Sequence, residues 1–158
     1  MREGARVLLV LALSGCGPPD ASTPEGLAAR VQAEIRAENW GGLFDLLGAD
    51  GRTYLDADLR EILATAKDAR ETGLTLPELD RVPLKDAYVR VMKASMSNAR
   101  FKERLHTRYG TSGLGSVEGT PTARQITLRA PEDRTETLFA ARVDGLWRLT
   151  RFPWDWRR

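Results

Sequence analysis

The sequence predicts an α+β domain with its helices first and an antiparallel sheet last. Apolar residues recur every three or four positions through most of residues 24–109, as they do along one face of an α-helix. After a glycine-rich stretch at residues 110–120 the apolar period falls to two, which is typical of strands. Asp144 and Gly145 then give a strong signal for a two-residue hairpin turn. Because helices and strands are separated along the chain, the pattern favours an α+β fold.

Two helices are expected at the start of this domain. Thr23 is suited to cap the first helix, with Pro24 in its first turn; alternatively, Ser22 forms a capping box with Glu25. The apolar face of the first helix consists of Leu27, Val31 and Ile35. A short second helix contains Trp40, Leu43, Phe44 and Leu47. Gly48 is a natural stop for it, and we expect these apolar residues in the core.

The middle of the chain is predicted to be helical with one break. Residues 54–70 place their apolar side chains on one face, and residues 73–77 interrupt that pattern with a glycine and a proline. A longer helix follows from about Pro83. Because its apolar face shifts toward a different side in its last part, this helix is expected either to bend near Ser97 and Asn98 or to turn its last part toward a different neighbour.

Three strands are expected in the last third of the chain. The segments 125–130, 135–143 and 146–152 have alternating apolar residues, with turns at 131–134 and at Asp144 and Gly145. Around a tight turn at the latter position, Val143 should face Leu146 and Arg142 should face Trp147.

This pairing makes both faces of the hairpin partly apolar. One face carries Phe139, Ala141, Val143, Leu146 and Phe152. The other face carries Leu138, Ala140, Trp147 and Leu149. A sheet with one solvated face would alternate more cleanly, so the second face should line a pocket, contact a partner or be covered by other parts of the chain.

The N-terminus carries the parts of a secretory signal. Two arginines precede a short apolar run, and Leu13, Ser14 and Gly15 lead to Cys16, the only cysteine in the chain. The apolar run is too short to span a bilayer, which needs about 20 residues. The run Leu-Ser-Gly-Cys resembles the lipobox of bacterial lipoproteins. In that family the cysteine is diacylated through sulfur, becomes the new N-terminus and is acylated there as well.

The lipobox resemblance divides the chain into three parts. Residues 1–15 are a signal peptide, residues 16–23 are the lipidated cysteine and a linker, and residues 24–158 are a single α+β domain. A secretory signal without lipid is the alternative. Gly17 stands where an aspartate tends to retain such lipoproteins in the inner membrane, so the resemblance implies attachment to the outer membrane, facing the periplasm.

Composition limits the function classes. Removing residues 1–15 from the 158 leaves 143, the length of one ordinary domain. The mature chain carries 22 basic and 21 acidic side chains, and this near-neutral balance argues against nucleic acid as a partner. Because acylation uses the only thiol, disulfides, thiol catalysis and cysteine-ligated metals are excluded, and we expect no cofactor.

A weaker resemblance concerns the fold. The tryptophan followed by Leu-Phe-x-Leu-Leu near the start, and the terminal hairpin Val-Asp-Gly-Leu-Trp-Arg-Leu, are similar to the NTF2-like superfamily. That resemblance implies a cone-shaped α+β fold whose curved sheet wraps a pocket. The superfamily includes isomerases and dehydratases. No catalytic residue carries over, because no position matches a catalytic motif of the family. Residues 53–109 also depart from its pattern, since they are almost wholly helical.

Charge is distributed unevenly along the helical segments. Residues 50–80 carry four basic and eight acidic side chains, whereas residues 81–109 carry eight basic and two acidic ones. The simplest interpretation is that the two segments lie close together and complement each other. A sharper one is a basic stripe that contacts anionic headgroups or an acidic partner. On a helical wheel this stripe consists of Arg90, Lys93, Arg100, Arg104 and Arg108.

The end of the chain is aromatic and basic, with Trp154 and Trp156 among arginines. It either packs back over the second sheet face or forms an exposed contact surface at a membrane or partner. We predict no catalytic or metal site. His106, the only histidine, is explained by favourable charge at a helix C-terminus, and the acidic residues after Gly48 lack the spacing of a calcium loop.

The sequence therefore favours a lipid-anchored envelope protein with a non-catalytic domain that binds a protein partner or a small apolar ligand. A small NTF2-like pocket enzyme and a structural accessory subunit of an envelope complex are the alternatives. An arginine and tryptophan surface away from the linker would favour a protein partner, and one on the linker side would favour lipid.

Overall fold

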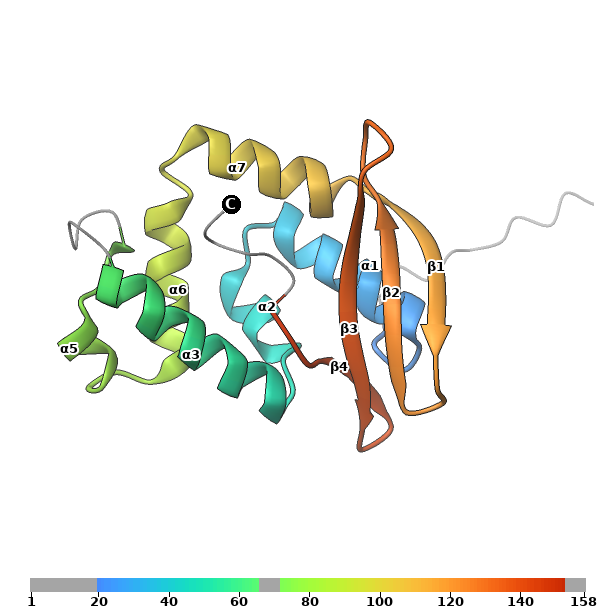
Figure 1. The fold of residues 1–158 in the computed structure, drawn as a ribbon, viewed down its shortest axis with the longest axis horizontal. Helices are drawn as coiled ribbons and strands as arrows, with labels where there is room; N and C mark the ends of the chain where they lie inside the picture. The colour runs from blue at the N-terminus through green and yellow to red at the C-terminus, as the bar shows by residue number, and fades with distance from the viewer. Residues whose placement is uncertain (1–19, 66–71, 153–158) are drawn as a thin grey trace, which may run out of the picture.

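The computed structural model describes residues 20–65 and 72–152, and it confirms the α+β class. Helices occupy the first part of the chain and a four-stranded sheet follows, as Figure 1 shows. The strands are β1 (Gly113–Gly119), β2 (Ala123–Arg129), β3 (Thr135–Val143) and β4 (Leu146–Leu149). They pair antiparallel in the order β1-β2-β3-β4, so each strand lies beside the next in the chain.

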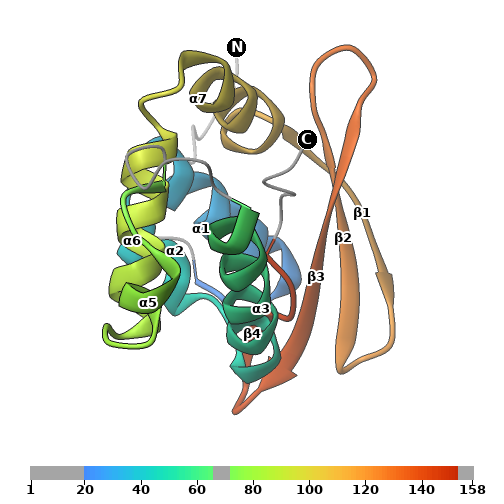
Figure 2. The ribbon, with the colours of Figure 1, turned by 60° about the vertical axis from the view of Figure 1, so that its left-hand side comes forward.

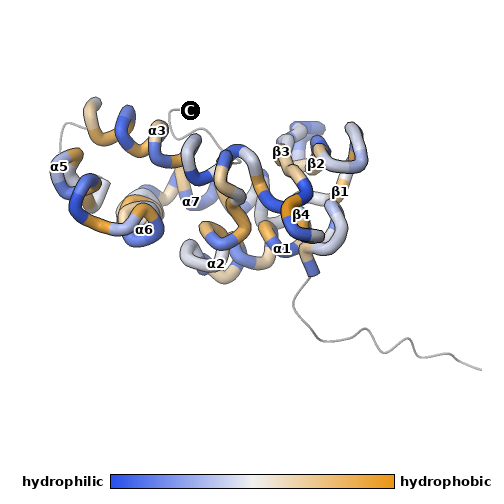
Figure 3. Tube along the Cα trace, turned by 90° about the horizontal axis from the view of Figure 1, so that it is seen from below, coloured by the Kyte–Doolittle hydropathy of each residue, from blue (hydrophilic) through white to orange (hydrophobic). Residues whose placement is uncertain are grey.

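The helices form a layer against one face of the sheet and extend beyond its β4 edge (Figure 2). They are α1 (Pro24–Arg36), α2 (Trp40–Asp45), α3 (Ala49–Thr65), α5 (Leu76–Leu79), α6 (Leu84–Ser95) and α7 (Ala99–Leu105). A single π-helical turn, η1 (His106–Gly110), continues α7. Hydrophobic and hydrophilic positions alternate along the helices, as expected where one side of each faces the core (Figure 3).

The first two helices agree with the sequence prediction. Thr23 caps α1 and accepts a hydrogen bond from the Gly26 amide at 3.0 Å, so of the two capping alternatives the structure contains the one with Thr23. Asn39 caps α2 in the same way. The apolar residues expected in the core are buried: Leu27, Val31, Ile35, Trp40, Leu43, Phe44 and Leu47.

The helix predicted from residue 54 starts earlier, and a short helix, α5, begins at the end of the break predicted at 73–77. α3 begins at Ala49. Its first turn passes close to the end of β4, and buried Gly51 leaves room there for the backbone carbonyl of Leu149. The short helix α5 has a capping box between Thr75 and Glu78, with Pro77 in its first turn. Hydrogen bonds from Thr75 lower the pKa of the Glu78 carboxyl, and the more distant charge of Arg90 acts in the same direction.

At Ser97 and Asn98, where a bend was one of the two expectations, the structure has a complete break between two helices. α6 ends at Ser95, and Asn98 caps the new helix α7 by accepting hydrogen bonds from the amides of Arg100 and Phe101. The break lets the apolar residues of each helix face a different neighbour. Figure 1 shows α7 running from the end of α6 back toward the sheet.

The glycine-rich segment after residue 110 was not expected to be a strand, and that expectation is wrong for its central part. Residues Gly113–Gly119 form β1, an edge strand paired with β2. Glycine serves here for close approach, since a Cβ at Gly115 would lie 2.9 Å from the carbonyl oxygen of Thr127. The pairing is irregular between Leu114 and Val117, which is why the two-residue period is weak in the sequence.

The predicted hairpin register is confirmed, with Val143 opposite Leu146 and Arg142 opposite Trp147. The face toward the helices is buried and consists of Ile126, Leu128, Leu138, Ala140, Trp147 and Leu149. One assignment is wrong: Phe152 does not join Phe139 on the outer face. β4 ends at Leu149, and the Phe152 ring instead packs edge-on against buried Tyr88 with its centroid 5.1 Å away.

The outer face of the hairpin is partly exposed over the described residues. Phe139 is half-buried, with the guanidinium of Arg151 4.8 Å from its ring centroid, and Val143 is 47% exposed. A shallow depression of about 400 Å³ lies here beside Phe139 and Ala141. The expected covering by Trp154 and Trp156 falls outside the described residues.

The described chain enters the domain at the β3–β4 end of the sheet. The amide of Trp147, two residues beyond the hairpin turn, donates a hydrogen bond to the Ala21 carbonyl at 2.8 Å. The last residues of the predicted linker therefore lie against β4. In Figures 1 and 2 this turn lies at the bottom of the view, whereas α7 and the β2–β3 turn lie at the top.

Candidate functional site: an arginine cleft between α7 and the β2–β3 turn

The basic stripe predicted from one continuous helix is divided by the break before α7. Arg90 and Lys93 lie on α6, and both are exposed. Arg100, Arg104 and Arg108 lie beyond the break, on α7 and η1, so the five residues do not form one stripe. The physical reason is the Asn98 cap, which starts a new helix with a new direction.

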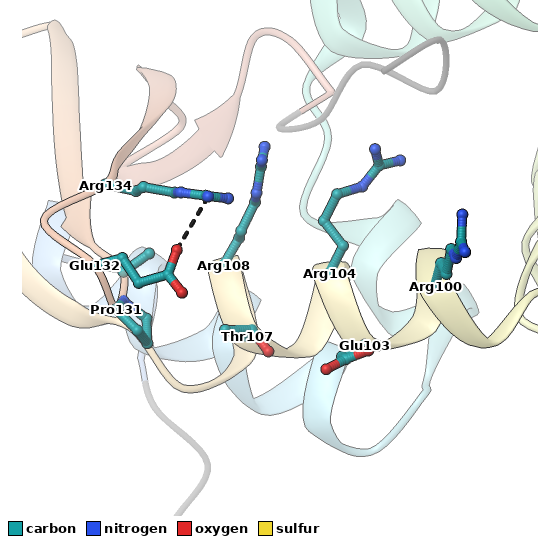
Figure 4. Close-up of a pocket in the computed structure, with 9 residues that line it drawn as sticks. Arg100, Glu103, Arg104, Thr107, Arg108, Pro131, Glu132 and Arg134 are labelled. Carbon is teal, nitrogen blue, oxygen red and sulfur yellow. Dashed lines mark ion pairs between the residues drawn. The ribbon is translucent and has the colours of Figure 1, made fainter.

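Three of the five residues nevertheless share a site. Arg100, Arg104 and Arg108 line a cleft of about 270 Å³ together with Arg134 from the turn between β2 and β3. The remaining lining residues are Glu103, Thr107, Ala130, Pro131 and Glu132. Figure 4 shows the Arg104 and Arg108 side chains extending in the same direction from the helix, with Arg134 directed toward Arg108. We call this site the arginine cleft.

Two of its arginines have no acidic partner. Within residues 20–65 and 72–152, Arg100 and Arg104 make no ion pair. The guanidinium of Arg104 instead lies 5.7 Å from the centre of the Phe101 ring. Arg134 pairs with Glu132 at 3.0 Å, but both are well exposed, so this pair contributes little to stability and exchanges readily for another partner.

The floor of the cleft is held by a buried polar group. Arg108 lies 3.3 Å from one carboxylate oxygen of Glu136, and the hydroxyl of Tyr109 donates to the other at 2.9 Å. Glu136 is the second residue of β3, so these contacts fix the π-turn η1 against the sheet. Burial, reinforced by the Glu136 carboxylate, raises the pKa of Tyr109 well above its ordinary range, and the phenol keeps its proton.

The arrangement is suited to binding anions. A guanidinium presents a planar set of donors that matches carboxylate or phosphate, and it stays charged at any physiological pH. It therefore cannot serve as a general acid or base there, and the four arginines of the cleft offer attraction and orientation to an anion. No family model matches this chain, and none of the curated proteins or solved structures compared with it is similar at a significant level.

His106 lies on η1 beside α1 rather than in the arginine cleft. Its Nε2 atom is 3.5 Å from a carboxylate oxygen of Glu38, which also pairs with Lys102 at 2.7 Å. The hydrogen bond from Lys102 lowers the pKa of Glu38. This cluster joins α7 to the end of α1, which gives His106 a structural explanation.

The two oppositely charged helical segments lie close together, as the simplest interpretation expected, and the charges of Arg90 and Arg81 both act to lower the pKa of Glu78. α3 and α6 are in contact. Where the described cations of residues 81–109 form ion pairs, their partners are Asp45, Glu38 and Glu136, which all lie outside residues 50–80.

Sequence reasoning missed the sheet side of the cleft. Arg134 and Glu132 belong to a turn that was interpreted only as a connection. Tyr109 and Glu136 are 27 residues apart in the chain, so no local pattern could have joined them. Cys16, Trp154 and Trp156 lie outside the described residues.

No three histidine, cysteine, aspartate or glutamate side chains in residues 20–65 and 72–152 converge as a metal site would require. Among the described helices, none has the length and apolar character needed to cross a bilayer.

The Tyr109 contact gives a pH-dependent prediction. Tyr109→Phe should cost about 1 kcal/mol of stability near pH 7, since it removes a buried hydrogen bond. In the unfolded chain the phenol ionises near pH 10, whereas in the native protein it stays protonated. Its contribution is therefore complete below pH 10 and is lost as the pH rises above it.

Urea unfolding of wild type and Tyr109→Phe at pH 8 and above pH 10 measures this effect. The stability difference between the two proteins should shrink at the higher pH, because only wild type loses the Tyr109 contribution. Buried Tyr88 is present in both proteins and cancels in the comparison. A difference that stays constant over this range would contradict the assignment.

Proposed function

We propose that this chain is a lipid-anchored protein of the bacterial cell envelope, attached through Cys16, whose α+β domain is a non-catalytic binding module. The observation that carries the binding role is the arginine cleft, where four guanidinium groups line one concavity and two of them have no ion-pair partner among the described residues. Arg100 and Arg104 lie beside two further guanidinium groups, Arg108 and Arg134, and an anionic ligand would complement their charge.

The anchoring part rests on the sequence. The run Leu-Ser-Gly-Cys places the only cysteine where a lipoprotein signal is cut. One acyl chain gives weak and reversible membrane binding, whereas two or more, at about 0.8 kcal/mol per buried methylene, hold a protein stably. With Gly17 after the cysteine, we propose the outer membrane as the site of attachment, with the domain facing the periplasm.

Binding is favoured over the NTF2-like enzyme by the chemistry of the residues in the cleft. Its cations are arginines, and its two lining carboxylates, Glu103 and Glu132, are exposed and so resemble surface groups more than tuned acids or bases. The buried Tyr109–Glu136 pair is satisfied internally and holds η1 on the sheet. An accessory subunit of an envelope complex would use the same surface and is a form of the binding role.

Replacing the cysteine tests the proposal. Cells expressing the full chain are grown with radiolabelled palmitate and fractionated. Wild type should carry label and sediment with membranes, whereas Cys16→Ser should carry no label and be released. Ser22→Ala, a change in the predicted linker, should behave like wild type. An unlabelled wild type, or a Cys16→Ser protein that keeps both label and membrane association, would show that the anchoring proposal is wrong.

A further inference from the structure

The arginine cleft lies at the opposite end of β3 from the point where the chain enters the domain. The carbonyl of Ala21 accepts a hydrogen bond from the Trp147 amide near the β3–β4 turn. The cleft includes Arg134, which lies at the other end of β3. β3 spans Thr135–Val143, which separates its two ends by about 27 Å at the usual rise per residue. From Cys16 to Ala21 the chain can reach at most about 18 Å. A domain standing upright on this tether would hold the cleft away from the membrane surface.

The shape and charge of the cleft also disfavour a lipid surface. A bilayer surface is flat and its anionic headgroups have no fixed positions, whereas the arginines here line a concavity of about 270 Å³. Glu103 and Glu132 share the same lining and would be repelled by a field of anionic headgroups. Interspersed charges of both signs match a partner whose own charges have fixed positions, since complementary patterns give specificity.

The spacing of the arginines indicates the form of the partner. Arg100, Arg104 and Arg108 follow each other at four-residue intervals, which corresponds to a rise of about 6 Å on a helix. Alternate side chains of an extended peptide repeat at about 6.7 Å and point to one side. Carboxylates at alternate positions of an extended segment can therefore meet successive arginines. Arg134 lies on the opposite wall. It would give up its exposed ion pair with Glu132 and bind a carboxylate of the segment instead.

We propose that the arginine cleft is the docking site for an extended acidic segment of a partner protein, with carboxylates at alternate positions. This proposal rests on the binding role and envelope location proposed above. Arg100 and Arg104 supply the attraction, since their charges are uncompensated within the described residues. Arg108 is held by Glu136 and sets the floor on which the segment lies.

The test uses the full lipidated chain in nanodiscs of uncharged phosphatidylcholine. The probe is a fluorescent peptide in which glutamates alternate with serines, and binding is followed by anisotropy. The double variant Arg100→Glu with Arg104→Glu should bind at least about tenfold more weakly than wild type, a loss typical of truncating central interface arginines. The matched control is Arg81→Glu with Arg142→Glu, which changes the net charge equally at exposed sites away from the cleft, and should bind within about twofold of wild type.

Two outcomes would overturn the proposal. Equal losses in both double variants would mean that only net charge matters. Vesicles containing phosphatidylglycerol that displace the peptide from wild type, and bind the Arg100→Glu, Arg104→Glu protein more weakly, would assign the cleft to lipid. If that variant is misfolded by circular dichroism, Arg100→Gln with Arg104→Gln takes its place, with the same requirement of a larger loss than the control.

Failure of this proposal is separate from failure of the anchoring proposal. The Cys16→Ser protein keeps the cleft, and it should bind the alternating peptide as wild type does. Loss of palmitate labelling therefore tests the anchor alone, and loss of peptide binding tests the cleft alone.

Discussion

Gly51→Ala is expected to destabilise the domain by about 2 kcal/mol, although the same change in most helices is stabilising. A Cβ at position 51 would lie only 2.4 Å from the carbonyl oxygen of Leu149 and 3.0 Å from a methyl group of Leu47. The oxygen is backbone and cannot move aside, because it accepts a hydrogen bond from the Gly48 amide at 3.0 Å. Overpacking of this kind costs roughly 1–3 kcal/mol or more, which exceeds the gain in helix propensity of up to about 1 kcal/mol.

Urea denaturation measures the effect, and Gly41→Ala is the matched control. Gly41 also lies in a helix, α2, but the nearest atom to its added methyl would be the flexible end of Lys85 at 3.4 Å. This control should therefore equal wild type or be slightly more stable. If Gly51→Ala matched Gly41→Ala, the close packing of α3 on the end of β4 would be wrong.

Gly51 also shows why one helix boundary was mispredicted. On sequence alone, the helix was expected to begin at residue 54, beyond the glycines at 48 and 51. The structure uses this glycine because α3 passes close to β4, whose Leu149 forms a parallel bridge with Leu47. β1 was missed for a related reason, since Gly115 is needed for close approach to β2. Tertiary contacts decided both cases.

Elements with strong local signals were predicted well. The span of β3 and the Asp144–Gly145 turn agree with the prediction, because alternation and turn chemistry are both encoded within a few residues. α1 agrees as well, since its cap and its four-residue apolar period are local. These features position the cleft, but they do not reveal it.

The helical side of the cleft was predicted from the sequence, and its sheet side was not. A helical wheel brought Arg100, Arg104 and Arg108 together, and they do line one site. The same wheel included Arg90 and Lys93, because it assumed that the helix continues through Asn98. Local capping by an asparagine side chain competes with helix continuation, and the printed sequence does not show which will prevail. Arg134 comes from a distant turn and required the fold.

Leu138→Ala is expected to destabilise the domain by about 3 kcal/mol. Leu138 is fully buried, and it lies opposite Ile126 at the centre of the sheet face that packs on the helices. Removing its methyl groups costs the lost transfer free energy and leaves a cavity, which together amount to roughly 2–5 kcal/mol for such sites. Denaturant unfolding followed by tryptophan fluorescence measures the loss, since buried Trp147 reports on the adjacent strand.

The matched control on the same strand is Val143→Ala. Val143 is 47% exposed on the outer face, so its truncation should change stability by no more than about 0.5 kcal/mol. The pair tests the strand register, because a slip of one residue would turn every even-numbered side chain of β3 outward. Glu136 shares the face of Leu138, and such a slip would also remove its contacts with Tyr109 and Arg108. Equal costs for the two variants would therefore contradict the sheet register and, with it, the floor of the arginine cleft.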